Sequence, residues 1–131
     1  MNVVTQGNPK SDLQNSQTSE MTKYEIALGR VLNGTLNNPM LAGFAVQFAG
    51  EQHYVLRFTM FPNIPYYLCK NRDSQTQYTA FAKIVRDPNS SAVRFQNPIG
   101  SGKLQPDLKS HLEIRFPLLN ISVFMNLFPR S

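Results

Sequence analysis

The sequence lacks the features of an exported or membrane-spanning protein. Its single cysteine, Cys69, has no partner for an internal disulfide. The longest apolar stretch, residues 118–128, is too short and too interrupted to cross a bilayer, and the first residues have no cationic start followed by an apolar core. These absences predict an intracellular protein, cytoplasmic or nuclear, that is not secreted and has no membrane span.

Groups that perform catalysis are also scarce. The two histidines, His53 and His111, have no cysteine or carboxylate neighbours at metal-ligand spacing. Lys70 and Arg72 are near Cys69, but a single cysteine after aromatic and apolar residues is more typical of a buried structural thiol. The string GSGK at 100–103 is not a phosphate-binding loop, because Leu104 follows it where serine or threonine is required. We therefore predict no enzyme activity, no catalytic residues, no metal, no cofactor and no small-molecule substrate.

Positive charge is concentrated in the later part of the chain. Residues 1–40 hold three basic and three acidic side chains, whereas the remainder holds ten basic and five acidic ones, which accounts for the whole net charge of +5. An excess of this kind favours an anionic partner.

The chain divides into a polar tail and one domain. Residues 1–20 are rich in Asn, Gln, Ser and Thr, a composition that predicts a disordered tail. Residues 21–131 form a single domain of ordinary size. Residues 21–34 predict a helix, because Thr22 and Glu25 have the spacing of a capping box and Gly34 suits the position after a helix end.

Alternating apolar residues follow the predicted helix. Phe44, Val46 and Phe48 alternate with small or polar residues, and further alternating segments occur at 53–61, 77–85 and 111–128. The segment 97–110 reads as a long loop. The predicted fold is an α+β domain, a mainly antiparallel sheet of six or seven strands with one N-terminal helix packed on it. A small β-barrel is the alternative.

Aromatic and basic residues are interleaved from residue 53 onward. If one set of alternating residues points into the core (Tyr54, Leu56, Phe58 and Met60; Tyr78, Ala80, Ala82 and Ile84), the outward sets each combine a cation with a phenyl ring. Rings that stack on bases, beside cations that follow the phosphates, are typical of single-strand binding. The sequence thus predicts a non-enzymatic, sequence-tolerant protein that binds single-stranded DNA or RNA. The predicted nucleic-acid-binding residues are Arg57, Phe61, Tyr66, Lys70, Arg72, Phe81, Lys83, Arg86 and Arg94.

The outward sets have a second interpretation. They are half apolar, as in Val55 and Val85, which is equally typical of a sheet whose second face is covered by another subunit. The alternative function is a small oligomeric structural or assembly protein, viral or a subunit of a larger complex, whose partners are its own copies or another protein.

Overall fold

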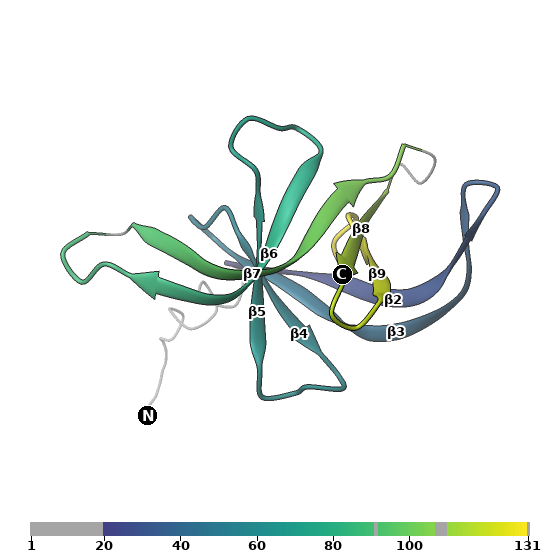
Figure 1. Cartoon of the computed structure of the whole chain (residues 1–131), viewed down its shortest axis with the longest axis horizontal. Helices are drawn as coiled ribbons and strands as arrows, with labels where there is room; N and C mark the ends of the chain where they lie inside the picture. The colour runs from purple at the N-terminus through teal and green to yellow at the C-terminus, as the bar shows by residue number, and fades with distance from the viewer. Residues whose placement is uncertain (1–19, 91, 107–109, 131) are drawn as a thin grey trace, which may run out of the picture.

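A computed structural model describes residues 20–90, 92–106 and 110–130. Eight antiparallel strands are hydrogen-bonded in chain order, and the last pairs with the first, so that the sheet closes into a barrel (Figure 1). The strands are β2 (Met21–Leu32), β3 (Thr35–Phe48), β4 (Tyr54–Phe58), β5 (Pro65–Lys70), β6 (Gln77–Arg86), β7 (Val93–Leu104), β8 (His111–Phe116) and β9 (Ile121–Asn126). The chain thus runs up and down around the barrel, and successive turns lie at alternate ends.

The core fills the barrel interior, and every second residue of a strand contributes to it. A barrel of eight strands is just wide enough for side chains to fill. Tyr54, Leu56 and Phe58 of β4 all face this core, as the alternation predicted, and so do Tyr78 and Ala80 of β6. The core consists of Ile26, Ala45, Leu56, Leu68, Ala80, Leu112, Ile114, Phe116, Val123 and Met125.

The predicted N-terminal helix is wrong, because residues 21–32 form strand β2. The strand pairs with β3 over its length, and the turn between them is Asn33-Gly34, with φ angles of 53° and 75°. Asn-Gly is the strongest short hairpin signal, since both residues accept the positive φ of a type I′ turn. Gly34 therefore ends a strand where we predicted the end of a helix, and the described residues contain no helix.

The fold class is corrected accordingly, from a sheet with a helix on it to an all-β structure. The sheet is antiparallel, as predicted, but has eight strands in place of six or seven, and it closes into the barrel that was the alternative. The predicted disordered tail lies outside the described residues except for Glu20.

The segment predicted as a loop at 97–110 is partly strand. Strand β7 continues through the GSGK string to Leu104, where Gly102 faces the interior and Lys103 is exposed. A side chain at Gly100 would meet the carbonyl oxygen of Arg115 at 2.5 Å, so this glycine allows β7 and β8 to approach closely.

Two hairpins extend beyond the barrel wall as ribbons. Barrel closure between β2 and β9 involves only the pairs Ile26–Met125 and Ala27–Phe124, after which β2 leaves the wall with β3. We call residues 28–41 the β2–β3 arm. Strand β6 leaves β5 after Phe81 and continues with β7, and we call residues 82–97 the β6–β7 arm. The two arms point in opposite directions along the longest axis of the molecule (Figure 1).

Candidate nucleic-acid interface

Two parallel rows of side chains lie on the outer surface of the barrel, the first from β3 to β6 and the second from β3 to β5. In the first row Val46, Val55, Tyr67 and Phe81 are direct partners of one another on successive strands. In the second row, two residues along each strand, Phe44, Arg57 and Pro65 are paired in the same way. We call these seven residues the outer wall. With strands about 4.8 Å apart, the four strands span about 14 Å from β3 to β6.

Phe44 lies at one margin of the outer wall among three cations. The Lys23 Nζ atom lies 4.8 Å from the centre of its ring, and the Arg130 guanidinium carbon lies 5.3 Å from it. Arg57 is the register partner of Phe44 on β4. One carboxylate, Glu25, is also present, 3.9 Å from Arg130. This margin is therefore aromatic with a net positive charge.

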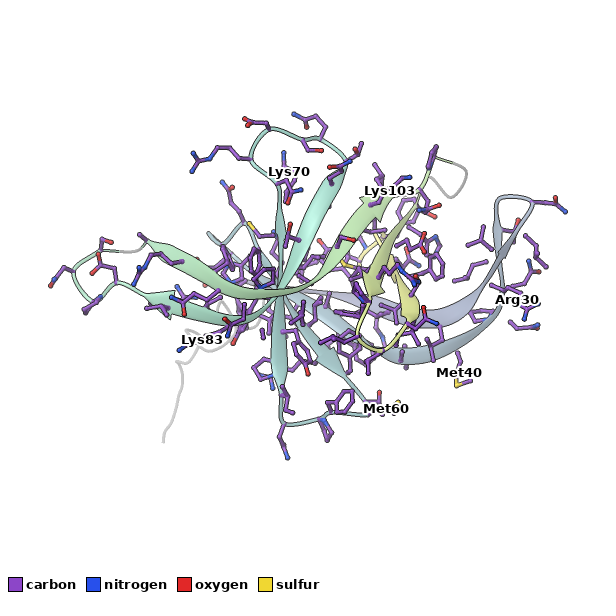
Figure 2. All side chains as sticks on the ribbon, in the orientation of Figure 1. Arg30, Met40, Met60, Lys70, Lys83 and Lys103 are labelled. Carbon is purple, nitrogen blue, oxygen red and sulfur yellow. The ribbon has the colours of Figure 1, made fainter. Side chains whose placement is uncertain are left out.

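The nine predicted residues do not form one face. Arg57 and Phe81 belong to the outer wall, while Lys83, Arg86 and Arg94 lie on the β6–β7 arm. Lys70 and Lys83 lie far apart in Figure 2, the first near the β5–β6 turn and the second on the arm. Arg72 is exposed in the β5–β6 turn.

Two predicted aromatic residues belong elsewhere. Tyr66 packs against the core, with its ring centre 6.0 Å from that of Phe58, because its place in β5 alternates with the outward Tyr67. Phe61 is half-buried in the β4–β5 turn, outside the outer wall. Neither ring is thus in the row that Tyr67 and Phe81 share.

Sequence reasoning missed Tyr67, Phe44, Lys23 and Arg130. In most strands the large apolar residues face the core, but in β3 the small residues Gly43 and Ala45 are buried and Phe44 between them faces outward. Lys23 was placed in a predicted helix, and Arg130 comes from the end of the chain, where its backbone N–H donates to the Lys23 carbonyl.

The β6–β7 arm is packed against the barrel by an aromatic cluster. Phe95 of the arm lies with its ring centre 5.3 Å from those of both His53 and Phe81, and His53 lies 6.3 Å from Tyr67. His53 is only 5% exposed. Tyr67 and Phe81 of the outer wall therefore both border this cluster.

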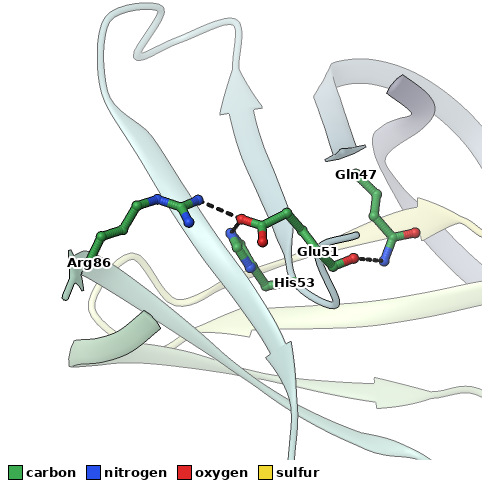
Figure 3. A network of polar contacts seen from close by, with 4 residues as sticks. All are labelled: Gln47, Glu51, His53 and Arg86. Carbon is green, nitrogen blue, oxygen red and sulfur yellow. Dashed lines mark hydrogen bonds and ion pairs between the residues drawn. The ribbon is translucent and has the colours of Figure 1, made fainter. Parts of the chain in front are cut away.

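A polar network fixes the same arm to the β3–β4 turn (Figure 3). The Arg86 Nη2 atom donates to Glu51 Oε1 at 2.5 Å, and this carboxylate lies 3.9 Å from His53 Nε2. The hydrogen bond from Arg86 lowers the pKa of Glu51. Burial lowers the pKa of His53, an effect that the Glu51 charge opposes. Arg86 thus binds a carboxylate of its own chain.

Acidification is expected to lower stability through His53. Its pKa in the folded state is below its ordinary value of 6.5, so the unfolded chain binds the proton more readily as the pH falls through that value. His111, whose pKa burial also lowers, acts in the same direction. The midpoint of thermal unfolding should fall by several degrees from about pH 7.5 to about pH 5. His53→Phe should flatten this dependence, and an equally steep one in that variant would contradict the assignment.

Cys69 and one groove among the described residues do not belong to the outer wall. Burial raises the pKa of Cys69, which disfavours the reactive thiolate. The part of the chain that the structure describes has no group of three metal-ligating side chains. A groove of about 750 Å³ between the β2–β3 arm and β9 is lined by apolar residues such as Leu36 and Phe128 and by polar ones, among them Glu25, His111 and Asn126. In residues 20–90, 92–106 and 110–130, no helix is long and apolar enough to cross a membrane.

The fold and the wall together define a small antiparallel barrel with an aromatic and basic outer surface. No family model, curated protein or solved structure matches the chain. The function must therefore be inferred from the geometry of this surface.

Proposed function

We propose that this protein binds single-stranded nucleic acid on its outer wall, without catalysis and without strong preference for sequence. The observation that carries the proposal is the continuous pair of rows from Phe44 to Phe81, with cations at both ends. Lys23, Arg57 and Arg130 surround Phe44, and Lys83 follows Phe81 on the same strand. This is the arrangement that a single strand requires, because bases stack on rings while phosphates approach cations.

The positions of the rings support single-stranded over duplex ligands. Tyr67 is half-buried in the wall and offers part of its ring to an unpaired base, whereas Lys23 and Arg130 lie over the Phe44 ring, where they can meet phosphates. The described residues contain no helix that could enter a major groove, but the two arms are β-ribbons, which a major groove also admits, so the preference for single strands rests on the rings. Sequence tolerance follows from the chemistry, since every base has a face that can stack and every nucleotide has a phosphate.

The experiment measures binding of a labelled mixed-sequence single-stranded oligonucleotide, and of its duplex, at low and high salt. Tyr67→Ala should weaken single-strand binding by about 1 to 3 kcal/mol and duplex binding much less. Arg57→Ala should weaken both to a similar extent and reduce the salt slope by about 1. Lys103→Ala, which removes an exposed cation from β7, is the matched control and should leave binding nearly unchanged.

Three outcomes would contradict the proposal. Binding that ignores salt would exclude phosphate contacts as its basis. Equal losses on single strands and duplex in Tyr67→Ala would exclude stacking. A loss in Lys103→Ala as large as that in Arg57→Ala would mean that the outer wall is not the site.

The second candidate function is assembly into an oligomer, and the first row of the outer wall favours it. Val46 and Val55 are apolar outward residues beside Tyr67, a combination typical of subunit interfaces. Light scattering on the same samples separates the two functions. A mass above that of the monomer that persists in high salt and ignores the oligonucleotide would favour assembly.

A further inference from the structure

One end of the barrel gathers most of the exposed large hydrophobic side chains. Strands that run in one direction lead into the β2–β3, β4–β5, β6–β7 and β8–β9 turns. The β6–β7 arm points away from the β2–β3 arm (Figure 1) and contacts the β3–β4 turn through Arg86 and Glu51, so only the other three segments are grouped here. Of the eleven exposed large hydrophobic residues in the described part of the chain, eight belong to these three segments. They are Leu32, Met40, Leu41, Met60, Ile64, Leu118, Leu119 and Ile121. We call this the apolar end.

The apolar end is strongly exposed and distinct from the rest of the surface. Leu118 is 88% exposed and Met60 is 79% exposed, so these side chains protrude from turns and do not form a flat face. Met40 and Met60 both lie in the lower right of Figure 2, while Lys70 and Lys103 lie in its upper part. A large group of exposed apolar side chains, with polar residues around it, is typical of a protein or membrane interaction site.

The charged side chains of these three segments all have one sign. The three segments, residues 28–42, 58–66 and 115–122, contain no carboxylate. Three exposed arginines lie in or beside them. Arg30 is on the β2–β3 arm, Arg57 pairs with Pro65 at the base of the β4–β5 turn, and Arg115 donates to Asn120 Oδ1 at 2.7 Å in the β8–β9 turn.

We infer that the apolar end docks onto the surface of an anionic lipid bilayer. Aliphatic side chains at the tips of turns enter the boundary between headgroups and acyl chains, and arginines around them contact lipid phosphates. The absence of carboxylates at this end removes the repulsion that an anionic surface would otherwise meet. This inference goes beyond the proposed function, and of its residues only Arg57 also belongs to the outer wall.

Charge and side-chain type also disfavour the other occupants. A second copy docked end to end would bring Arg30, Arg57 and Arg115 toward the same cations with no carboxylate between them. A nucleic-acid strand would require exposed rings for stacking, whereas the eight residues are Leu, Met and Ile.

The test is cosedimentation of the full chain with vesicles. One set contains only phosphatidylcholine, and the other contains equal parts of phosphatidylcholine and phosphatidylserine. The protein should sediment with the mixed vesicles and bind the neutral ones at least about tenfold more weakly. The double variant Leu118→Ser/Leu119→Ser should bind mixed vesicles at least about tenfold more weakly, and Arg115→Ala about fivefold more weakly.

Phe48→Ser is the matched control, because Phe48 lies at the other end of the barrel and is 47% exposed, close to the 55% of Leu119. It should bind mixed vesicles like the unchanged protein. Thermal unfolding should be similar in all variants, since the replaced side chains are exposed. Oligonucleotide binding by Leu118→Ser/Leu119→Ser should be unchanged, so failure of the lipid inference and failure of the proposed function are distinguishable.

Four results would overturn the inference. The first is absence of sedimentation with mixed vesicles, and the second is equal binding to both vesicle types. The third is an equal loss in Phe48→Ser. The fourth is a dimer in light scattering that Leu118→Ser/Leu119→Ser abolishes while vesicle binding is unchanged, which would assign the apolar end to a second copy.

Discussion

Gly43→Ala is expected to lower the free energy of unfolding by at least about 3 kcal/mol. Gly43 is buried in β3, and a Cβ atom there would lie 2.1 Å from the Arg57 carbonyl oxygen and 2.9 Å from the Phe58 Cα atom. Both are backbone atoms, so β3 and β4 would have to separate and break their ladder. Denaturant unfolding monitored by circular dichroism would measure the loss, with a midpoint lowered and a slope unchanged.

Gly50→Ala provides the contrasting control for Gly43→Ala. No atom lies within 4 Å of a Cβ placed on Gly50, but its φ of 83° is one that alanine adopts at a cost of about 1 kcal/mol. Comparing the two variants therefore separates the loss of stability caused by a steric clash from the loss caused by an unfavourable φ angle. A loss in Gly43→Ala no larger than in Gly50→Ala would mean that β3 and β4 do not approach as closely as the structure indicates.

The alternation of apolar residues predicted which residues of β4 point inward, but not where this strand ends. Leu56 and Phe58 face the core, whereas Met60, placed in the same set, is exposed. The reason is local: the Phe61 N–H donates to the Phe58 carbonyl in a tight turn that ends β4. A pattern of period two continues through this turn in the sequence, so the pattern alone does not mark the end of the strand.

The helix prediction was wrong for an energetic reason. A capping box such as Thr22 with Glu25 is worth about 1 kcal/mol. Strand β2 instead gains a ladder with β3 and buries Ile26 in the barrel. A capping box can be recognised from four neighbouring residues. The pairing of Ile26 with Met125 cannot, because the two residues are almost one hundred positions apart in the chain.

The structure brings only some of the predicted binding residues together on one surface. Arg57 and Phe81 are on the outer wall, as outward positions of alternating strands. Arg86 was predicted to face a ligand, but Glu51 binds it, a residue 35 positions earlier that only the curvature of the β6–β7 arm brings near. Strand order and curvature depend on contacts between distant residues, which periodicity does not contain.

Leu56→Ala is expected to lower the free energy of unfolding by about 2 to 5 kcal/mol, because Leu56 is fully buried at the centre of the core. It faces inward from β4 between Ala45 and Tyr66, so its removal leaves a cavity. Val55→Ala, on the adjacent outward position, is the matched control, and its loss should be no more than about 1 kcal/mol. Thermal unfolding of both variants measures the difference. Similar losses would contradict the assignment of inward and outward residues in β4.

If the assignment holds, folded Leu56→Ala should bind the oligonucleotide with unchanged affinity, because the outer wall is intact. A stable variant of the outer wall such as Tyr67→Ala should lose affinity. Stability and binding would then depend on opposite faces of the same sheet.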